Sequence, residues 1–175
     1  KISTAGDNGQ FRTPRHIIKM MVELTQPKPL ENIADPACGT AGFLVAAGEY
    51  IRENHAKAMV DDKTRAHFQS EMFTGYDFDN SMLRIGNMNM VMHGFDGATI
   101  DYKDSLSSSD DDDLAEQFDL ILANPPFTGT LDYDSVAADL LQTVKTKKTE
   151  LLFNALFLRA LKTGGRAAVA VPDGV

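Results

Sequence analysis

The sequence predicts an α/β fold in which a mostly parallel sheet is covered by helices on both faces. Short apolar segments alternate along the chain with amphipathic segments of helical length, which is typical of parallel sheets with crossover helices. The segment 118–123 (FDLILA) is almost continuously apolar, as expected of a strand in the middle of such a sheet. The chain has 175 residues, of which 43% are hydrophobic, and this suits one domain with its own core.

The first quarter of the chain predicts a helix, a short strand and the start of a second helix. Thr13 caps the first helix and Pro14 lies in its first turn. Its apolar stripe consists of Ile17, Ile18, Met21, Val22 and Leu24, and prolines 27 and 29 end it. Residues 31–35 form the strand. After the turn at 36–42, the second helix runs to about residue 58 and buries Phe43, Ala47, Tyr50 and Ile51.

The middle of the chain predicts a polar surface insertion, a strand and a third helix. Residues 59–70 are the insertion, and residues 72–76 (MFTGY) are the strand. Asn80 caps the helix and Gly94 closes it. Its methionines lie at helical spacing, so we expect them to pack in the core rather than to bind a ligand. The expected buried face consists of Met82, Ile85, Met88, Val91 and Met92.

The last part of the chain predicts three strands and one helix. The strands lie near 98–102, at 118–123 and at 166–171, and the helix spans 150–162 before Gly164 and Gly165. The acidic stretch at 107–113 is expected to be a solvated loop, and residues 128–149 are expected to be irregular. Lys145, Lys147 and Lys148 form a small basic cluster, which is either a contact for DNA phosphate or a plain surface loop.

Composition narrows the classes of function. The net charge of -8 argues against this chain gripping nucleic acid alone, because phosphate contacts need lysine or arginine. The lone Cys38 excludes an internal disulfide and predicts a cytoplasmic location, and we expect it to be a small buried residue rather than a nucleophile. The four histidines are scattered, so we expect no metal site. Because the chain lacks an initial methionine and ends within a predicted strand, we interpret it as a fragment of a longer protein.

The turn after the first strand is a candidate site for a cationic ligand. Gly39 and Gly42 remove side chains where a ligand would approach the backbone, and Asp35 precedes them. A carboxylate there disfavours a pyrophosphate and favours a cation. S-adenosylmethionine carries a sulfonium and an ammonium and has no phosphate, and the spacing is not that of a nicotinamide-binding turn. An ordinary strand-to-helix turn remains the alternative.

Two further carboxylates follow the next strands. Asp77 suits a pair of ribose hydroxyls because a carboxylate accepts two hydrogen bonds, although it could instead cap the following helix. Asp104 could accept from the amino group of an adenine ring, and a solvated loop carboxylate is its alternative.

The stretch Asn124-Pro125-Pro126-Phe127 is the most specific signal. The two prolines fix the backbone as it leaves the strand, and their missing amide hydrogens leave carbonyls as the main polar groups. The Asn124 side-chain oxygen and the Pro125 carbonyl can therefore accept both hydrogens of an exocyclic amine and free its lone pair to attack. Phe127 offers a stacking face for a flat base. The alternative is a turn whose phenylalanine packs in the core.

With these motifs in place, the sequence resembles the adenine-N6 DNA methyltransferases, and more closely the modification subunits of type I restriction–modification systems. The motifs that carry the likeness are residues 9–15 (GQFRTPR), 34–44 (ADPACGTAGFL), 122–127 (LANPPF) and 150–174, which end in KTGGRAAVAVPDG. The resemblance implies a Rossmann-like fold of the S-adenosylmethionine-dependent methyltransferases. It also implies that residues 1–175 are one catalytic core, from which an N-terminal helical domain and C-terminal strands are absent.

The resemblance also implies roles for individual residues. Gln10, Phe11 and Thr13 would lie against the methionine part of S-adenosylmethionine, and Asp35, Ala37, Gly39, Thr40 and Gly42 would wrap its middle. Asp77 would hold the ribose and Asp104 the adenine amine. Asn124, Pro125, Pro126 and Phe127 would form the catalytic motif that receives the target adenine.

The implied partners are DNA, a specificity subunit that reads the DNA sequence, and a restriction subunit with motor and nuclease activity. No membrane and no metal are expected. Two other functions remain open. One is methylation of the N4 atom of cytosine or of a protein glutamine, because the same pocket suits any planar amine or amide. The other is a non-catalytic binding or assembly module of the same fold.

Overall fold

A computed structural model describes residues 12–107, 114–127 and 136–173. Its centre is a five-stranded sheet with the order β3-β2-β1-β4-β5, in which all neighbouring strands are parallel. The strands are β1 (Ile33–Asp35), β2 (Phe73–Asp77), β3 (Thr99–Tyr102), β4 (Phe118–Ala123) and β5 (Leu161–Val169). The α/β class, the parallel sheet and the central place of the apolar segment 118–123 are confirmed.

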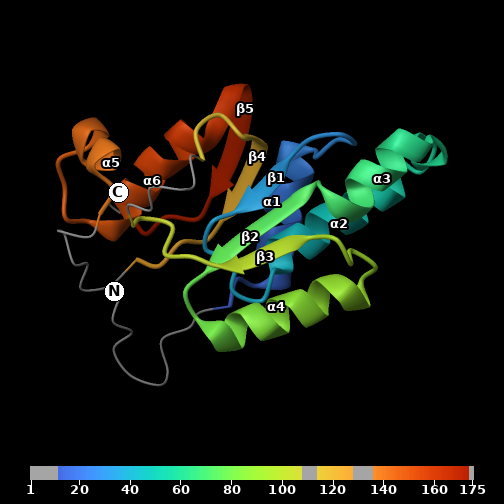
Figure 1. Cartoon of the computed structure of the whole chain (residues 1–175), viewed down its shortest axis with the longest axis horizontal. Coiled ribbons are helices and arrows are strands. Elements are labelled where there is room, and N and C mark those ends of the chain that lie inside the picture. The colour runs from blue at the N-terminus through green and yellow to red at the C-terminus, as the bar shows by residue number, and fades with distance from the viewer. Residues whose placement is uncertain (1–11, 108–113, 128–135, 174–175) are drawn as a thin grey trace.

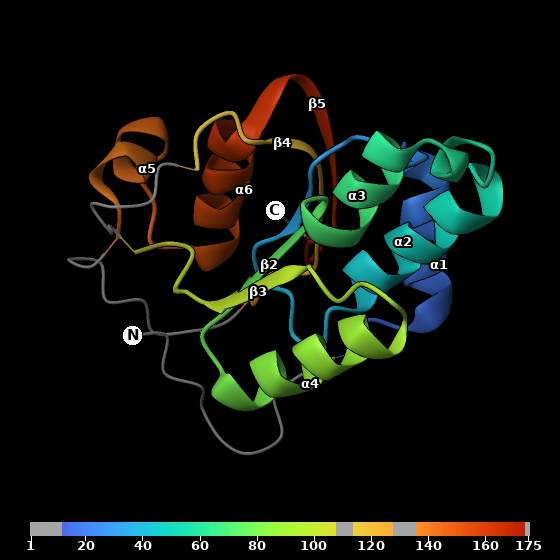
Figure 2. The ribbon, with the colours of Figure 1, turned by 45° about the vertical axis from the view of Figure 1, so that its right-hand side comes forward.

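Helices cover both faces of this sheet (Figures 1 and 2). The helices of the first face are α1 (Arg15–Thr25), α2 (Gly42–Asn54), α3 (Asp62–Ser70) and α4 (Asn80–Met92), with the short 3-10 turn η1 at Ala58–Val60. The second face carries α5 (Ala138–Thr143) and α6 (Thr149–Ala160). Alternate residues of β4 point into the two cores: Leu120 and Leu122 face the first set of helices, whereas Ile121 and Ala123 face α5 and α6. None of the helices in the described ranges is long and apolar enough to cross a membrane.

The segment 59–70, predicted to be a polar surface insertion, is mostly exposed, and most of it folds into α3, a helix that the sequence did not predict. The Phe68 ring of this helix is buried against Phe73 and Phe95, with ring centroids 5.8 and 5.4 Å away. One buried aromatic side chain is enough to dock an otherwise polar helix. Likewise, α5 lies within the segment 128–149 that we expected to be irregular.

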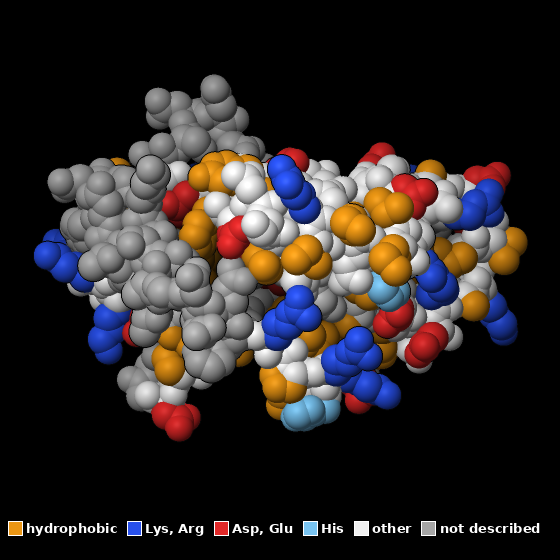
Figure 3. All heavy atoms as spheres, turned by 90° about the horizontal axis from the view of Figure 1, so that it is seen from below, with side chains coloured by type: hydrophobic (Ala, Val, Ile, Leu, Met, Phe, Trp, Pro, Cys, Tyr) orange, Lys and Arg blue, Asp and Glu red, His pale blue; other side chains and the backbone are white. Residues whose placement is uncertain are grey.

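The predicted buried face of α4 is also wrong. The helix buries Leu83, Gly86 and Met90 instead, and Gly86 lets it approach the turn after β1. Met82 is half-buried, and the rest of the predicted face is exposed (Figure 3): Ile85 by 41%, Met88 by 63%, Val91 by 55% and Met92 by 79%. Leu24 of α1 is exposed as well, by 76%, unlike the other members of its predicted stripe.

Two predicted helix caps are wrong and the helix ends differ slightly from expectation. Asp79, not Asn80, caps α4, because its Oδ1 accepts hydrogen bonds from the amides of Ser81 and Met82. Thr13 makes no capping hydrogen bond to α1. The last helix ends at Ala160 and β5 begins at Leu161, so the two glycines lie inside the strand at an irregularity in its register with β4.

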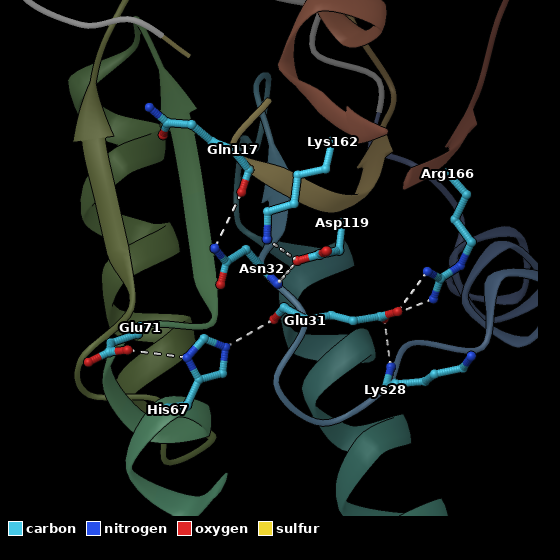
Figure 4. Close-up of polar contacts among 9 residues, drawn as sticks. All are labelled: Lys28, Glu31, Asn32, His67, Glu71, Gln117, Asp119, Lys162 and Arg166. Atoms are coloured by element: carbon cyan, nitrogen blue, oxygen red, sulfur yellow. Dashed lines mark hydrogen bonds and ion pairs between the residues drawn. The ribbon is translucent and has the colours of Figure 1, made fainter. Parts of the chain in front are cut away.

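A polar network ties these elements together at the amino ends of the strands (Figure 4). Arg166 of β5 donates to both carboxylate oxygens of Glu31, at 2.8 and 2.9 Å, and to the carbonyls of Thr25 and Gln26 at the end of α1. Asp119 accepts from the Asn32 amide at 2.8 Å and from the Lys162 ammonium at 2.7 Å. The network fixes the carboxyl end of α1 on the sheet.

We expect Arg166→Met to lower the free energy of unfolding by about 1–3 kcal/mol, because it removes the guanidinium donor from two helix-end carbonyls and from the half-buried Glu31 carboxylate, which keeps only the Lys28 amide. Urea unfolding followed by circular dichroism measures the change. Arg65→Met is the control: it breaks an exposed ion pair with Asp62 and should cost under about 1 kcal/mol. Equal losses in the two variants would contradict the role given to Arg166.

Candidate active site

The candidate site lies at the carboxyl ends of the strands, opposite the polar network. The chain leaves β1 toward α2 on one face of the sheet, whereas it leaves β4 toward α5 and α6 on the other. Ligands of open parallel sheets bind at such a reversal. One continuous cleft there is lined by residues from four strand ends and from the start of α1, including Thr13, Asp35, Gly39, Asp77, Asp104 and residues 124–127.

Asp35, at the end of β1, is a buried carboxylate with little to stabilise its charge. Its side chain is 1% exposed, and its Oδ1 accepts one hydrogen bond, from the amide of Ala37 at 3.1 Å. Burial is the main cause that raises the pKa of Asp35 to about 8; the hydrogen bond from the Ala37 amide lowers this pKa, and the negative charge of Asp77 raises it by a smaller amount. A bound cation would stabilise the ionised form of this carboxylate.

Asp77, at the end of β2, ties the turn after β1 to the neighbouring strand. Its Oδ2 accepts from the amide of Gly39 at 2.9 Å, and its Oδ1 accepts from the amide of Asp79 at 2.9 Å. Burial raises the pKa of Asp77 above its ordinary value. The capping role that we considered for this stretch belongs to Asp79, which leaves Asp77 facing the cleft.

Two residues that sequence reasoning missed hold the same turn from other directions. Ser105, buried after β3, donates from its hydroxyl to the carbonyl of Pro36 at 2.6 Å. Asn89 of α4 donates from its side chain to the carbonyl of Thr40 at 2.9 Å. The only hint of Asn89 in the sequence is a polar side chain inside a methionine-rich helix. Together with Asp77, these residues fix the turn before any ligand arrives.

The two glycines of the turn have different roles. Gly39 adopts a left-handed φ of 51°, and a Cβ atom on it would meet no other atom within 4 Å. Its backbone is therefore open to a ligand. Gly42, in contrast, begins α2, and a Cβ atom there would lie 3.3 Å from Ile18 of α1. Its bare backbone serves helix packing. Ala37 and Thr40 also lie on the cleft.

Asn124 presents an unsatisfied acceptor at the end of β4. Its Nδ2 donates to the hydroxyl oxygen of Thr13 at 3.0 Å, so the predicted helix cap is instead part of the site. The Oδ1 atom of Asn124 is buried and has no hydrogen-bond partner in the described part of the chain. An unmet buried acceptor costs about 1–3 kcal/mol, so this oxygen is suited to receive a donor from a ligand.

The other residues of the NPPF corner differ in their exposure. Pro125 is buried, whereas Phe127 lies on the cleft and is 37% exposed. The alternative that Phe127 packs in the core is therefore wrong. Asp104 is half-buried on the cleft, and its Oδ1 accepts from the amide of Leu106 at 3.2 Å.

Several other predictions are resolved or lie outside the described ranges. Cys38 is buried, and burial raises the pKa of its thiol well above the usual range, so it is not a reactive nucleophile. The described residues contain no cluster of three potential metal ligands. The lysines at 145, 147 and 148 do not line the cleft. Gln10, Phe11 and the acidic run 110–113 lie outside the described residues.

The amino-acid sequence is similar to those of known methylase subunits. The chain is 35% identical over 99% of its length to the EcoEI type I restriction enzyme methylase subunit of Escherichia coli, and 31% identical over 98% to the EcoKI methylase subunit of strain K12. It spans only 34% and 33% of these two relatives, about a third of their length.

Solved structures agree with the sequence relatives. The crystal structure of the type I restriction enzyme EcoKI M protein matches with a TM-score of 0.81 at 30% identity, over 95% of this chain and 35% of that one. A modification subunit of a putative type I restriction enzyme from Vibrio vulnificus YJ016 matches with a TM-score of 0.79 at 34% identity, over 97% and 36%. The family model described as N-6 DNA Methylase matches residues 2–175. The chain belongs to the N-6 DNA methylase family.

Proposed function

We propose that this chain carries the catalytic site of a DNA methyltransferase that transfers a methyl group from S-adenosylmethionine to N6 of adenine. The observation that carries the proposal is the buried Oδ1 of Asn124, which has no partner among the described residues, on the same cleft as the exposed ring of Phe127. An acceptor without a donor, next to a stacking face, is complementary to an adenine amino group. The names of the relatives, type I methylase subunits, support the same reaction.

The turn after β1 fits S-adenosylmethionine better than a phosphate-bearing cofactor. Asp35 is buried and Asp77 is half-buried, and both line the cleft; in their ionised form they would repel a phosphate and stabilise a cation. We propose that Gln10, Phe11 and Thr13 lie against the methionine part, and that Asp35 and its turn wrap the middle. The other members of that turn are Ala37, Gly39, Thr40 and Gly42.

Asp77 and Asp104 complete the proposed cofactor site. Each oxygen of Asp77 accepts one backbone amide and keeps a second lone pair, so the carboxylate can still accept from a ribose. Asp104 is placed to accept from the adenine amine of the cofactor. When bound, the cofactor supplies an electrophilic methyl group on a sulfonium.

The residues of the NPPF corner would position the substrate nitrogen. An adenine flipped from the DNA stacks on Phe127, at an unstacking cost of a few kcal/mol. Thr13 accepts the Asn124 Nδ2 hydrogen, which leaves Oδ1 available to a donor on the substrate. Oδ1 and the Pro125 carbonyl accept the two N6 hydrogens, which keeps the nitrogen lone pair out of the ring and available for attack. Pro126 stiffens the corner. The work of the protein is positioning, with no covalent enzyme intermediate.

We further propose that the chain acts within a modification subunit of a type I restriction–modification system, together with a specificity subunit, a restriction subunit and DNA. A cytoplasmic location remains a prediction from Cys38. Methylation of cytosine N4 or of a protein glutamine would use the same acceptors. Mass spectrometry of DNA and protein treated with labelled S-adenosylmethionine separates these products, and methylated cytosine or glutamine without N6-methyladenine would refute the adenine assignment.

We expect Asn124→Ala to lower methyl transfer by at least about 100-fold, since it removes an acceptor that acts on the reacting nitrogen. Transfer is measured with tritiated S-adenosylmethionine, using the complete protein with its specificity subunit. Calorimetry should show cofactor binding changed less than a few-fold.

Thr13→Val is the matched variant, because it removes the partner of Nδ2 but keeps the acceptor. Its loss of transfer should be smaller than that of Asn124→Ala, since the asparagine side chain can still reach the nitrogen. Loss of cofactor binding in parallel with loss of transfer in Asn124→Ala would contradict the role of this residue.

The affinity for S-adenosylmethionine should rise with pH up to and slightly beyond 8. The pKa of Asp35 is about 8 in the free protein, so below that pH the carboxyl is mostly protonated and must lose its proton to stabilise the cation. Calorimetry in buffers of different ionisation enthalpy measures the released proton. In Asp35→Asn, the affinity should be weaker above pH 8 and the proton release should vanish. A pH-independent affinity in the parent protein would refute this linkage.

The same carboxyl predicts how the stability of the free protein depends on pH. The folded-state pKa of Asp35, about 8, exceeds its value of 3.8 in the unfolded chain, so the folded state holds the extra proton between these values. The contribution of Asp35 is therefore fully present below pH 3.8 and is lost as pH rises toward 8. Relative to the parent, Asp35→Asn should gain stability between pH 5 and 8 in urea unfolding. No relative gain across this range would contradict the raised pKa.

A further inference from the structure

The charges that line the cleft are unevenly distributed. Four of the carboxylates that line the cleft lie at or just after the ends of the first three strands: Asp35, Asp77, Asp79 and Asp104. The others, Glu23, Glu49 and Glu53, lie on α1 and α2. No carboxylate belongs to the NPPF corner itself, and the chain segment next to it carries two arginines, Arg12 and Arg15. Apart from Lys103, the cleft is therefore acidic beyond β1–β3, and two arginines make it basic at the start of α1, next to the NPPF corner.

Arg12 and Arg15 are held close to Asn124 by the contact between α1 and β4. They flank Thr13, whose hydroxyl lies 3.0 Å from the Asn124 side chain, and Arg15 is the first residue of α1. Both side chains are exposed and both residues line the cleft. Their position beside the target corner is thus fixed by a helix start and by a hydrogen bond across 111 residues of sequence.

Among the arginines that the structure describes, Arg12 and Arg15 line the cleft and have no ion-pair partner, whereas Arg84 has no such partner but lies outside the cleft. The remaining four arginines have partners. Arg166 pairs with Glu31, Arg159 with Asp139 and Arg65 with Asp62. Arg52 donates to the carbonyl of His93 and lies over the Phe95 ring. Within the described ranges no acidic partner is found for Arg12 or Arg15. Of the two other cations on the cleft, Lys19 lies 3.7 Å from Glu23 and Lys103 lies over the Tyr76 ring.

We propose that Arg12 and Arg15 bind the DNA phosphates that flank the flipped target adenine. The guanidinium group presents a planar fork of donors that matches phosphate oxygens, and it stays charged at any physiological pH. The proposal rests on the proposed function for the identity of DNA as the partner. The proposal adds a path for the DNA strand. Its phosphate backbone enters along the start of α1, because the carboxylates beyond β1–β3 repel phosphate from their part of the cleft.

The proposal also accounts for how a chain with a net charge of -8 can receive DNA at its active site. Non-specific affinity arises from released counterions, and the number of phosphates neutralised sets its dependence on salt. Two local arginines contribute about two such contacts whatever the distant charges are, since exposed charges beyond about 8–10 Å are screened.

The test is a salt titration of DNA binding by the complete protein assembled with its specificity subunit. Fluorescence anisotropy of a labelled DNA duplex gives the dissociation constant between about 50 and 200 mM KCl. We expect Arg12→Gln and Arg15→Gln each to weaken binding roughly tenfold near 0.1 M salt and to reduce the slope of log K against log salt by about 1. Arg12→Lys and Arg15→Lys should keep the slope, because they keep the charge.

Arg84→Gln is the matched control, since Arg84 is exposed on α4 and does not line the cleft. It should leave the slope unchanged, and calorimetry should show the same affinity for S-adenosylmethionine in all variants. A parent slope retained by the Arg12→Gln and Arg15→Gln variants overturns the proposal, as does a parent complex that binds no DNA. A parent complex that binds DNA but transfers no methyl group refutes the proposed function instead, and the slopes still decide the role of the arginines.

Discussion

The hydrogen bond between Thr13 and Asn124 is the contact on which the candidate site depends. An asparagine side chain has a donor end and an acceptor end, and only one of them suits an amino group as a ligand. Thr13 accepts from Nδ2, and in this arrangement Oδ1 is buried and has no partner among the described residues. The fold positions both residues of this contact. Arg166 binds the carboxyl end of α1 to the sheet, and Thr13, just before the amino end of α1, lies at the tip of β4.

The site holds two unfavourable features in the free protein, and they are of different kinds. No donor among the described residues reaches Oδ1 of Asn124, and burial raises the pKa of the Asp35 carboxyl to about 8. Each would be relieved by one part of a ternary complex, the amine of a substrate in the first case and a cationic cofactor in the second. Hydrogen bonds with Asp77, Ser105 and Asn89 hold the turn after β1 in place, so the turn cannot easily rearrange to satisfy these groups itself. Both groups therefore destabilise the free protein at positions where a bound ligand would stabilise it.

The sequence predicts which residues lie at the strand ends, but it does not predict the hydrogen bonds between them. Periodicity and the polar residues after each apolar segment were enough to predict the parallel sheet and to bring Asp35, Asp77, Asp104 and Asn124 to one edge. Thr13 was misread as a helix cap because a Thr-Pro pair predicts one locally, whereas its actual partner lies 111 residues away. Asn89 was overlooked for the same reason, since its bond to Thr40 spans 49 residues. Long-range polar pairs leave no periodic trace in a single sequence.

The misassigned face of α4 shows how a backbone requirement can override hydrophobic pattern. Five apolar side chains at helical spacing outweigh Leu83, Gly86 and Met90 in any count of hydrophobicity, yet the smaller set is buried. The deciding residue is Gly86, where a Cβ atom would lie 3.1 Å from the carbonyl oxygen of Gly39. Close approach at that point brings Asn89, one turn further along the helix, to the carbonyl of Thr40. The helix is therefore oriented by the turn after β1 that it supports, and its larger apolar side chains are left on the surface (Figure 3).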